Sequence, residues 1–133
     1  MFLENSDDQS NMDTGTNKKY RYELDTWSRL LDYLQQENVY FKNLLSHVIK
    51  NDKGNTLLEK AEYFQNKFVN KDAVIVLLRQ DISEQIKWIE KGGDDGLAEL
   101  FMKKHKRLNQ DIDKLEEEFK RLKIDFSDYV AVD

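Results

Sequence analysis

The chain has 133 residues, which is enough for one domain with a hydrophobic core but not for two. It contains no cysteine, which excludes disulfide bonds, a thiol nucleophile and thiolate metal ligands, and no proline that would interrupt a long helix. Charged residues make up 35% of the chain and hydrophobic residues 39%, a balance typical of elongated helical proteins with a large surface.

The net charge of −5 comes from the two ends of the chain and from one loop, because acidic and basic residues balance within each periodic segment. A surface of mixed charge does not attract nucleic acid or anionic lipid over long distances. The residues after Met1 are too polar for a signal peptide, and the longest apolar run, Ala73 to Leu78, is far shorter than the ~20 residues of a membrane span. We therefore expect a cytoplasmic protein that binds neither nucleic acid nor membrane.

Residues 1–19 are polar and lack hydrophobic periodicity, which predicts a flexible N-terminal tail. From residue 20, apolar residues recur at alternating steps of three and four, which keeps one stripe of a helix facing a neighbour. We call these positions the seam. The first helix is expected at about 20–50 and ends before Asn51–Gly54, which suit a helix C-cap. Its seam comprises Tyr20, Leu24, Trp27, Leu31, Leu34, Asn38, Phe41, Leu45 and Val48.

The second helix is expected at about 56–91, because Thr56 and Glu59 form a capping box and two glycines follow its end. Its seam comprises Leu57, Ala61, Phe64, Phe68, Lys71, Ile75, Leu78, Ile82, Gln85 and Ile89. The third helix is expected at about 95–124, capped by Asp94 or Asp95. Its seam comprises Phe101, His105, Leu108, Ile112, Leu115, Phe119, Leu122 and Phe126. Residues 127–133 are interpreted as a C-terminal tail, either a frayed last turn or an arm on the bundle.

Both connections between the helices are short, so consecutive helices should be antiparallel neighbours. The sequence therefore predicts an all-α fold: an elongated, up-down-up, antiparallel three-helix bundle with coiled-coil-like packing over residues 20–126. An ordinary globular helix has about 11–12 residues, so helices of this length should form a rod.

Four seam positions are polar: Asn38, Lys71, Gln85 and His105. In antiparallel helices Asn38 and Lys71 should lie within one turn of each other, with Asn70 nearby. A buried asparagine restricts the register of packed helices, and a lysine at such a position can reach solvent along its aliphatic stem. We interpret these residues as register control or surface accommodation; the alternative is a polar ligand pocket.

His105 should lie level with Trp27, where we expect a partly buried imidazole that is stacked on an aromatic ring and hydrogen-bonded to a neighbour. The alternative is a ligating or proton-responsive group. The other histidine, His47, is expected near the opposite end of the rod, so the two cannot share a metal ion, and neither follows a glutamate at Glu-x-x-His spacing. We expect no metal site, no cofactor and no catalytic residues.

The apolar run Ala73–Leu78 covers more than one side of its helix, whereas a bundle helix normally buries one stripe. Exposed apolar patches commonly mark association surfaces. The candidate interaction surface comprises Leu30, Tyr33, Tyr40, Val74, Val76 and Leu77. The alternative is a wide seam in which the flanking residues contact the other two helices.

The function that follows is a non-enzymatic helical bundle mediating protein–protein association, as an adaptor, a regulator or a homo-oligomer such as a homodimer. One alternative is a small-molecule-binding bundle with a pocket near Trp27 and His105. Another is weak nucleic-acid association through the basic cluster Lys103, Lys104, Lys106 and Arg107, although helical geometry scatters these side chains around the helix.

Overall fold

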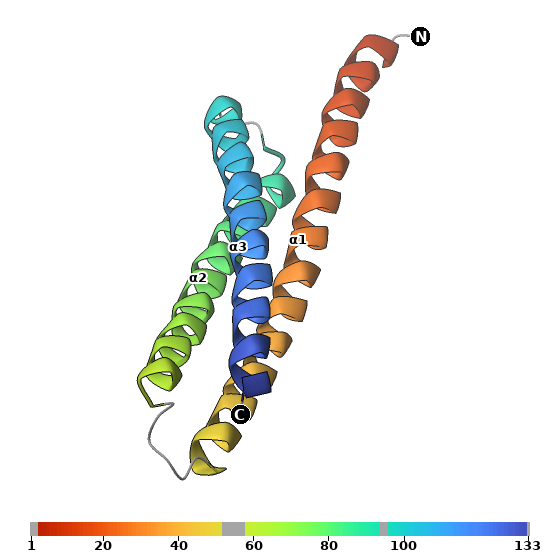
Figure 1. Ribbon diagram of the computed structural model, residues 1–133. Helices are drawn as coiled ribbons and strands as arrows, with labels where there is room; N and C mark the ends of the chain where they lie inside the picture. Colours follow the sequence, from red (N-terminus) through yellow and green to blue (C-terminus); the bar gives the residue numbers. More distant parts are fainter. Residues whose placement is uncertain (1–2, 52–57, 94–95, 133) are drawn as a thin grey trace.

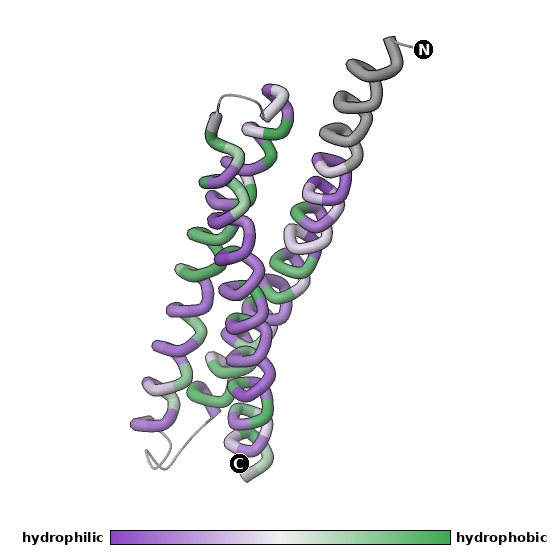
Figure 2. Tube along the Cα trace, turned by 90° about the horizontal axis from the view of Figure 1, so that it is seen from above, coloured by the Kyte–Doolittle hydropathy of each residue, from purple (hydrophilic) through white to green (hydrophobic). Residues whose placement is uncertain are grey.

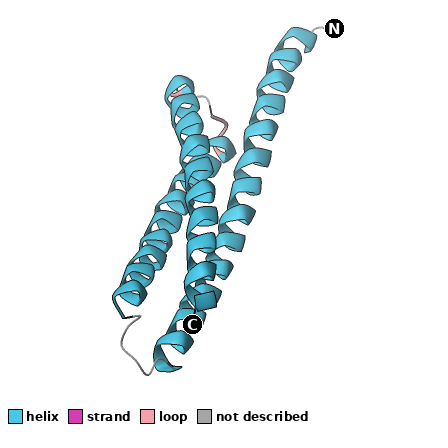
Figure 3. Cartoon of the chain, viewed as in Figure 1, coloured by secondary structure: helices cyan, strands magenta, loops and turns pink. Residues whose placement is uncertain are grey.

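Three long helices run up, down and up in the computed structural model, which describes residues 3–51, 58–93 and 96–132 (Figure 1). Helix α1 comprises Leu3–Asn51, α2 comprises Leu58–Glu90 and α3 comprises Ala98–Val132. No strand occurs in these three ranges (Figure 3). The predicted all-α three-helix bundle is confirmed.

The core of the bundle is built from the predicted seam. In α1 the seam residues from Leu24 to Val48 are buried, and in α3 all eight seam residues are buried. In α2 the seam is buried from Ala61 to Gln85; Ile89 is partly buried against the core, and Leu57 lies outside the described residues. Figure 2 shows the resulting alternation of hydrophobic and hydrophilic segments along each helix. Steps of three and four were therefore sufficient to identify the buried face of every helix.

Aromatic rings fill the end of the core where the chain terminates. Phe68 and Phe126 are almost fully buried, and their ring centroids lie 5.1 Å apart in an edge-on contact. Phe41 joins them from α1 at 5.9 Å and 5.6 Å, and Phe64 stacks on Phe68. Edge-on and stacked ring pairs each add about 0.5–1.5 kcal/mol beyond area burial. All three helices are thereby joined at one level of the rod.

The helices extend beyond the predicted bundle, residues 20–126, at both termini. Helix α1 begins at Leu3, so residues 3–19 are helical, and the N-terminal end of α1 projects beyond α2 and α3 (Figure 1). The sequence prediction relied on apolar periodicity, which reports burial and not helicity; extending an existing helix adds one hydrogen bond per residue without a new nucleation step. At the other end α3 continues to Val132, and Tyr129 is buried against Phe64, with centroids 4.9 Å apart.

The connection between α2 and α3 uses glycine in left-handed backbone conformations. Gly92 and Gly93 have φ of 101° and 62°, which only glycine adopts without strain. A Cβ atom on Gly93 would lie 2.7 Å from the ring of Trp88, so the turn also needs glycine for space. The predicted caps Thr56, Asp94 and Asp95 lie outside the described residues.

Candidate functional site

Asn38 lies fully buried between α1 and α2. Its amide nitrogen donates to the backbone carbonyl of Phe68 at 2.9 Å and to a carboxylate oxygen of Asp72 at 2.6 Å, and Lys42 pairs with the other oxygen of Asp72. The side-chain oxygen of Asn38 has no hydrogen-bond partner, which is unusual for a buried acceptor. The bonds to α2 would be lost in another register, as expected for a residue that aligns two helices.

Lys71, predicted to share a polar layer with Asn38, is turned toward a different helix. Its ammonium donates to Glu118 of α3 at 2.8 Å while its stem stays buried. This hydrogen bond is the main cause that lowers the pKa of Glu118. The two seam residues lie on the same level but serve different interfaces, because α2 has one flank against α1 and the other against α3.

Gln85 and His105 form a polar chain that connects all three helices. The Gln85 amide nitrogen donates to the Phe101 carbonyl at 3.2 Å, which directs its oxygen toward His105 Nδ1 at 2.7 Å. His105 Nε2 lies 2.8 Å from a carboxylate oxygen of Glu23 on α1. Both ring nitrogens thus face oxygen acceptors, and an imidazole protonated on both nitrogens donates to both.

The ring of His105 is enclosed by aromatic side chains and only 7% exposed. The centroids of Tyr20, Trp27 and Phe101 lie 4.6, 4.7 and 5.6 Å from it. The predicted stacked and hydrogen-bonded histidine is therefore what the structure shows. Through these contacts Glu23, Gln85 and His105 join α1, α2 and α3 at one level of the bundle.

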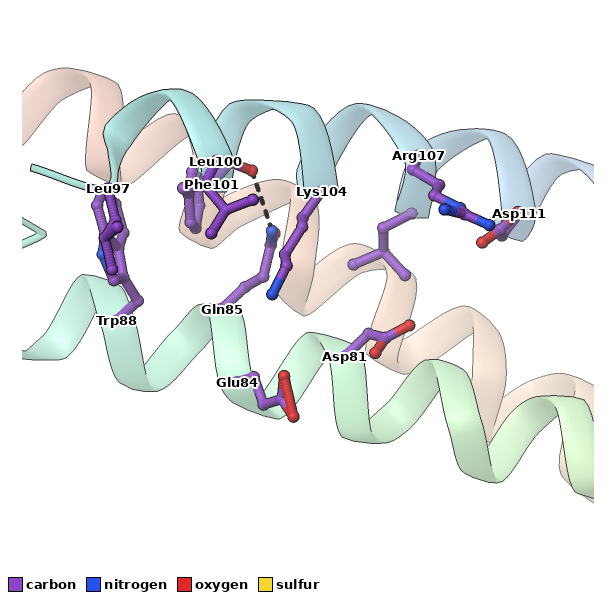
Figure 4. A pocket seen from close by; sticks show the side chains of 11 residues that line it. Asp81, Glu84, Gln85, Trp88, Leu97, Leu100, Phe101, Lys104, Arg107 and Asp111 are labelled. Atoms are coloured by element: carbon purple, nitrogen blue, oxygen red, sulfur yellow. Dashed lines mark hydrogen bonds between the residues drawn. The ribbon is translucent and has the colours of Figure 1, made fainter.

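An open pocket of about 420 Å³ lies next to this polar chain, between α2 and α3 (Figure 4). Such a volume falls within the ~300–1,000 Å³ of typical small-molecule sites. The apolar lining comprises Trp88, Leu97, Leu100, Phe101 and Leu108. The charged lining comprises Asp81, Glu84, Lys104, Arg107 and Asp111. Gln85 completes the wall and is shared with the chain that contains His105.

The lining residues occupy a regular place in the sequence. On both helices most of them immediately precede a seam residue, as Leu100, Lys104 and Arg107 precede Phe101, His105 and Leu108. These flanking positions form a second stripe along α3, beside the seam. The sequence prediction named Lys104 and Arg107 for their charge, but it missed the pocket, because a pocket depends on the distance between two helices.

The candidate interaction surface is divided by the structure. Val76 and Leu77 in the middle of α2 are 53% and 60% exposed, and Tyr33 and Tyr40 on α1 are also more than half exposed. Leu30 and Val74 instead are partly buried and pack against the core. The wide-seam interpretation therefore holds for two of the six residues, and the other four face solvent.

Two further kinds of site are absent from the described ranges 3–51, 58–93 and 96–132. There, no group of three His, Asp or Glu side chains is arranged to hold a metal ion. None of the helices in those ranges combines the length and apolar character needed to cross a bilayer. No protein-family model matches the chain, and comparison with curated proteins and with solved structures gives no significant match.

Proposed function

We propose that this protein is a non-enzymatic helical bundle that binds another protein through apolar side chains on the outer faces of α1 and α2. The observation that carries the proposal is the exposure of Val76 and Leu77 at the centre of α2. The core is complete without them, because Ile75 and Leu78 supply the buried contacts at this level. Two adjacent exposed aliphatic residues gain free energy when a partner covers them, by about 25 cal/mol per Å² of apolar surface.

A second apolar feature lies on the outer face of α1. Tyr22, Tyr33 and Tyr40 are all more than half exposed and recur at intervals of about three and about two helical turns, so they share one face. Tyrosine is enriched in protein interfaces because its ring provides apolar area and its hydroxyl a hydrogen bond. An elongated bundle with tyrosines on one helix and aliphatic residues on the next is well suited to contact a helical partner or a second copy.

The test uses the double variant Val76→Lys/Leu77→Lys, with Ile124→Lys as the matched control. Ile124 is an equally exposed aliphatic residue on α3, outside the proposed surface. Sedimentation equilibrium at high micromolar concentration measures self-association. Cross-linking in cell extract with quantitative mass spectrometry measures binding to other proteins.

We expect the α2 double variant to lose an association that the wild type and Ile124→Lys both retain. Because lysine is tolerated at exposed helix positions, all three proteins should have the same circular dichroism spectrum. A strictly monomeric wild type would exclude the homo-oligomer. The same set of cross-linked proteins from all three samples would exclude the α2 surface as the binding site.

A further inference from the structure

The pocket between α2 and α3 has a floor that is built to contact an apolar or aromatic group. Trp88 from α2 stacks on Phe101 from α3, with centroids 4.3 Å apart and planes 19° apart. Leu97 and Leu100 are nearly half exposed at its edge (Figure 4). The ring of Trp88 also lies close to Gly93, so contacts with both Phe101 and Gly93 fix its position. A preformed apolar floor lowers the ordering cost of binding.

The charged residues around the floor are unevenly distributed. Asp81 and Glu84 stand on the α2 wall, whereas Lys104, Arg107 and Asp111 come from α3 (Figure 4). In the described part of the chain none of these five side chains forms an ion pair within 4.0 Å. Elsewhere on the bundle comparable side chains do pair between helices, as Arg79 does with Asp32. The pocket therefore holds three carboxylates and two cationic side chains that are not joined in ion pairs.

Carboxylates outnumber cationic side chains in the pocket lining by three to two. Partial desolvation of the otherwise exposed Asp81 carboxylate, together with repulsion by Glu84 and Asp111, raises the pKa of Asp81, and the opposing effects of Lys104 and Arg107 are smaller. A positive charge beside Asp81 is accordingly favoured, and a negative charge is disfavoured. The apolar floor and this local charge together specify an occupant with a cationic head and an apolar body.

We propose that the α2–α3 pocket binds a small organic cation, with its protonated amine between Asp81 and Glu84 and its apolar body on Trp88 and Leu100. The site shares no residue with Val76 and Leu77 of the surface assigned to protein association, although Leu77 lies one helical turn from Asp81, so either proposal can fail without the other. The pocket volume suits a body of one aromatic ring with a short side chain.

The experiment titrates the full-length protein with three probes of similar shape and different charge: phenethylammonium, 2-phenylethanol and 3-phenylpropanoate. The chain has two tryptophans, so the indole N–H signals in a proton–nitrogen NMR spectrum report the site and an internal control. Trp88 lines the pocket, whereas Trp27 lies in the core beside His105. The variants Asp81→Asn and Glu84→Gln remove one charge each from the α2 wall; Asp113→Asn removes one from the exposed surface of α3 outside the pocket.

Phenethylammonium should shift the Trp88 signal saturably, with a dissociation constant of about 1–10 mM given its few non-hydrogen atoms. It should bind about fivefold more tightly than the neutral alcohol, which corresponds to ~1 kcal/mol for one partly exposed charge pair. Asp81→Asn and Glu84→Gln should remove most of that difference, and Asp113→Asn should keep it. Added salt should weaken the amine and not the alcohol.

Each of the following results would overturn the proposal. The first is equal affinity for the amine and the alcohol, which would leave only an apolar pocket. The second is tighter binding of 3-phenylpropanoate, which would reverse the sign of the charge preference. The third is the same affinity for phenethylammonium in Asp81→Asn, Glu84→Gln and the control Asp113→Asn. A fourth is a shift of the Trp27 signal as large as that of the Trp88 signal, which would show that the probe does not bind specifically in the pocket. Since Asp81 and Glu84 are exposed, these variants should fold as the wild type does, which circular dichroism verifies.

Discussion

Replacing Tyr129 by alanine tests whether the C-terminal residues belong to the bundle. Tyr129 is only 6% exposed and contacts Phe64 and Phe126, at 4.9 Å and 6.0 Å between ring centroids. Removing a buried aromatic side chain costs about 3–5 kcal/mol. Tyr129 lies in the last turn of α3, where the surroundings relax more easily, so we expect a loss of about 3 kcal/mol.

The matched control is Tyr22→Ala, because Tyr22 is 68% exposed on α1 and makes no aromatic contact within the described residues. Both substitutions change helix propensity equally, so their difference isolates burial. An exposed substitution should alter stability by less than about 0.5 kcal/mol.

Urea unfolding monitored by circular dichroism measures both effects. With a urea dependence of about 2 kcal/mol per M, a loss of 3 kcal/mol lowers the midpoint by about 1.5 M at unchanged slope. Equal midpoints for Tyr129→Ala and Tyr22→Ala would refute the reasoning and would restore the interpretation of residues 127–133 as a tail.

Two further predictions concern the α2–α3 turn and the buried lysine. Gly93→Ala should destabilise the protein by about 1–3 kcal/mol and change Trp88 fluorescence, because the new methyl group would clash with the Trp88 ring and alanine would be strained at this positive φ. Gly96→Ala, also at a positive φ but with open space around it, should cost less stability, and equal losses in thermal unfolding would contradict the steric reason. Lys71 lowers the pKa of Glu118, so this pair stabilises the fold fully at a pH above the ordinary carboxylate pKa and loses that effect as the pH falls through the lowered pKa. The stability difference between wild type and Glu118→Gln should therefore shrink below about pH 4, and a difference that is independent of pH would exclude an ionic contribution.

The sequence contained enough information for the fold and for the buried face of each helix. Apolar residues at steps of three and four identified the core, and the polar exceptions Asn38, Lys71, Gln85 and His105 were all correctly expected on that face. This succeeds because burial of an amphipathic stripe is the main free-energy gain of a bundle, and the stripe is periodic along the chain. The ends of the helices were less predictable, because a helix can continue where the apolar periodicity of the sequence stops, as α1 does in residues 3–19.

The partners of the polar residues and the pocket were decided only by tertiary structure. Periodicity places Asn38 and Lys71 on a seam, but it does not state that one bonds to Asp72 of α2 and the other to Glu118 of α3. Those pairs depend on the rotation of each helix about its axis and on the spacing between helices. Both arise from the simultaneous packing of all three helices around one core. The pocket beside Trp88 has the same origin: its residues lie on helical stripes visible in the sequence, and only the distance between α2 and α3 leaves space between them.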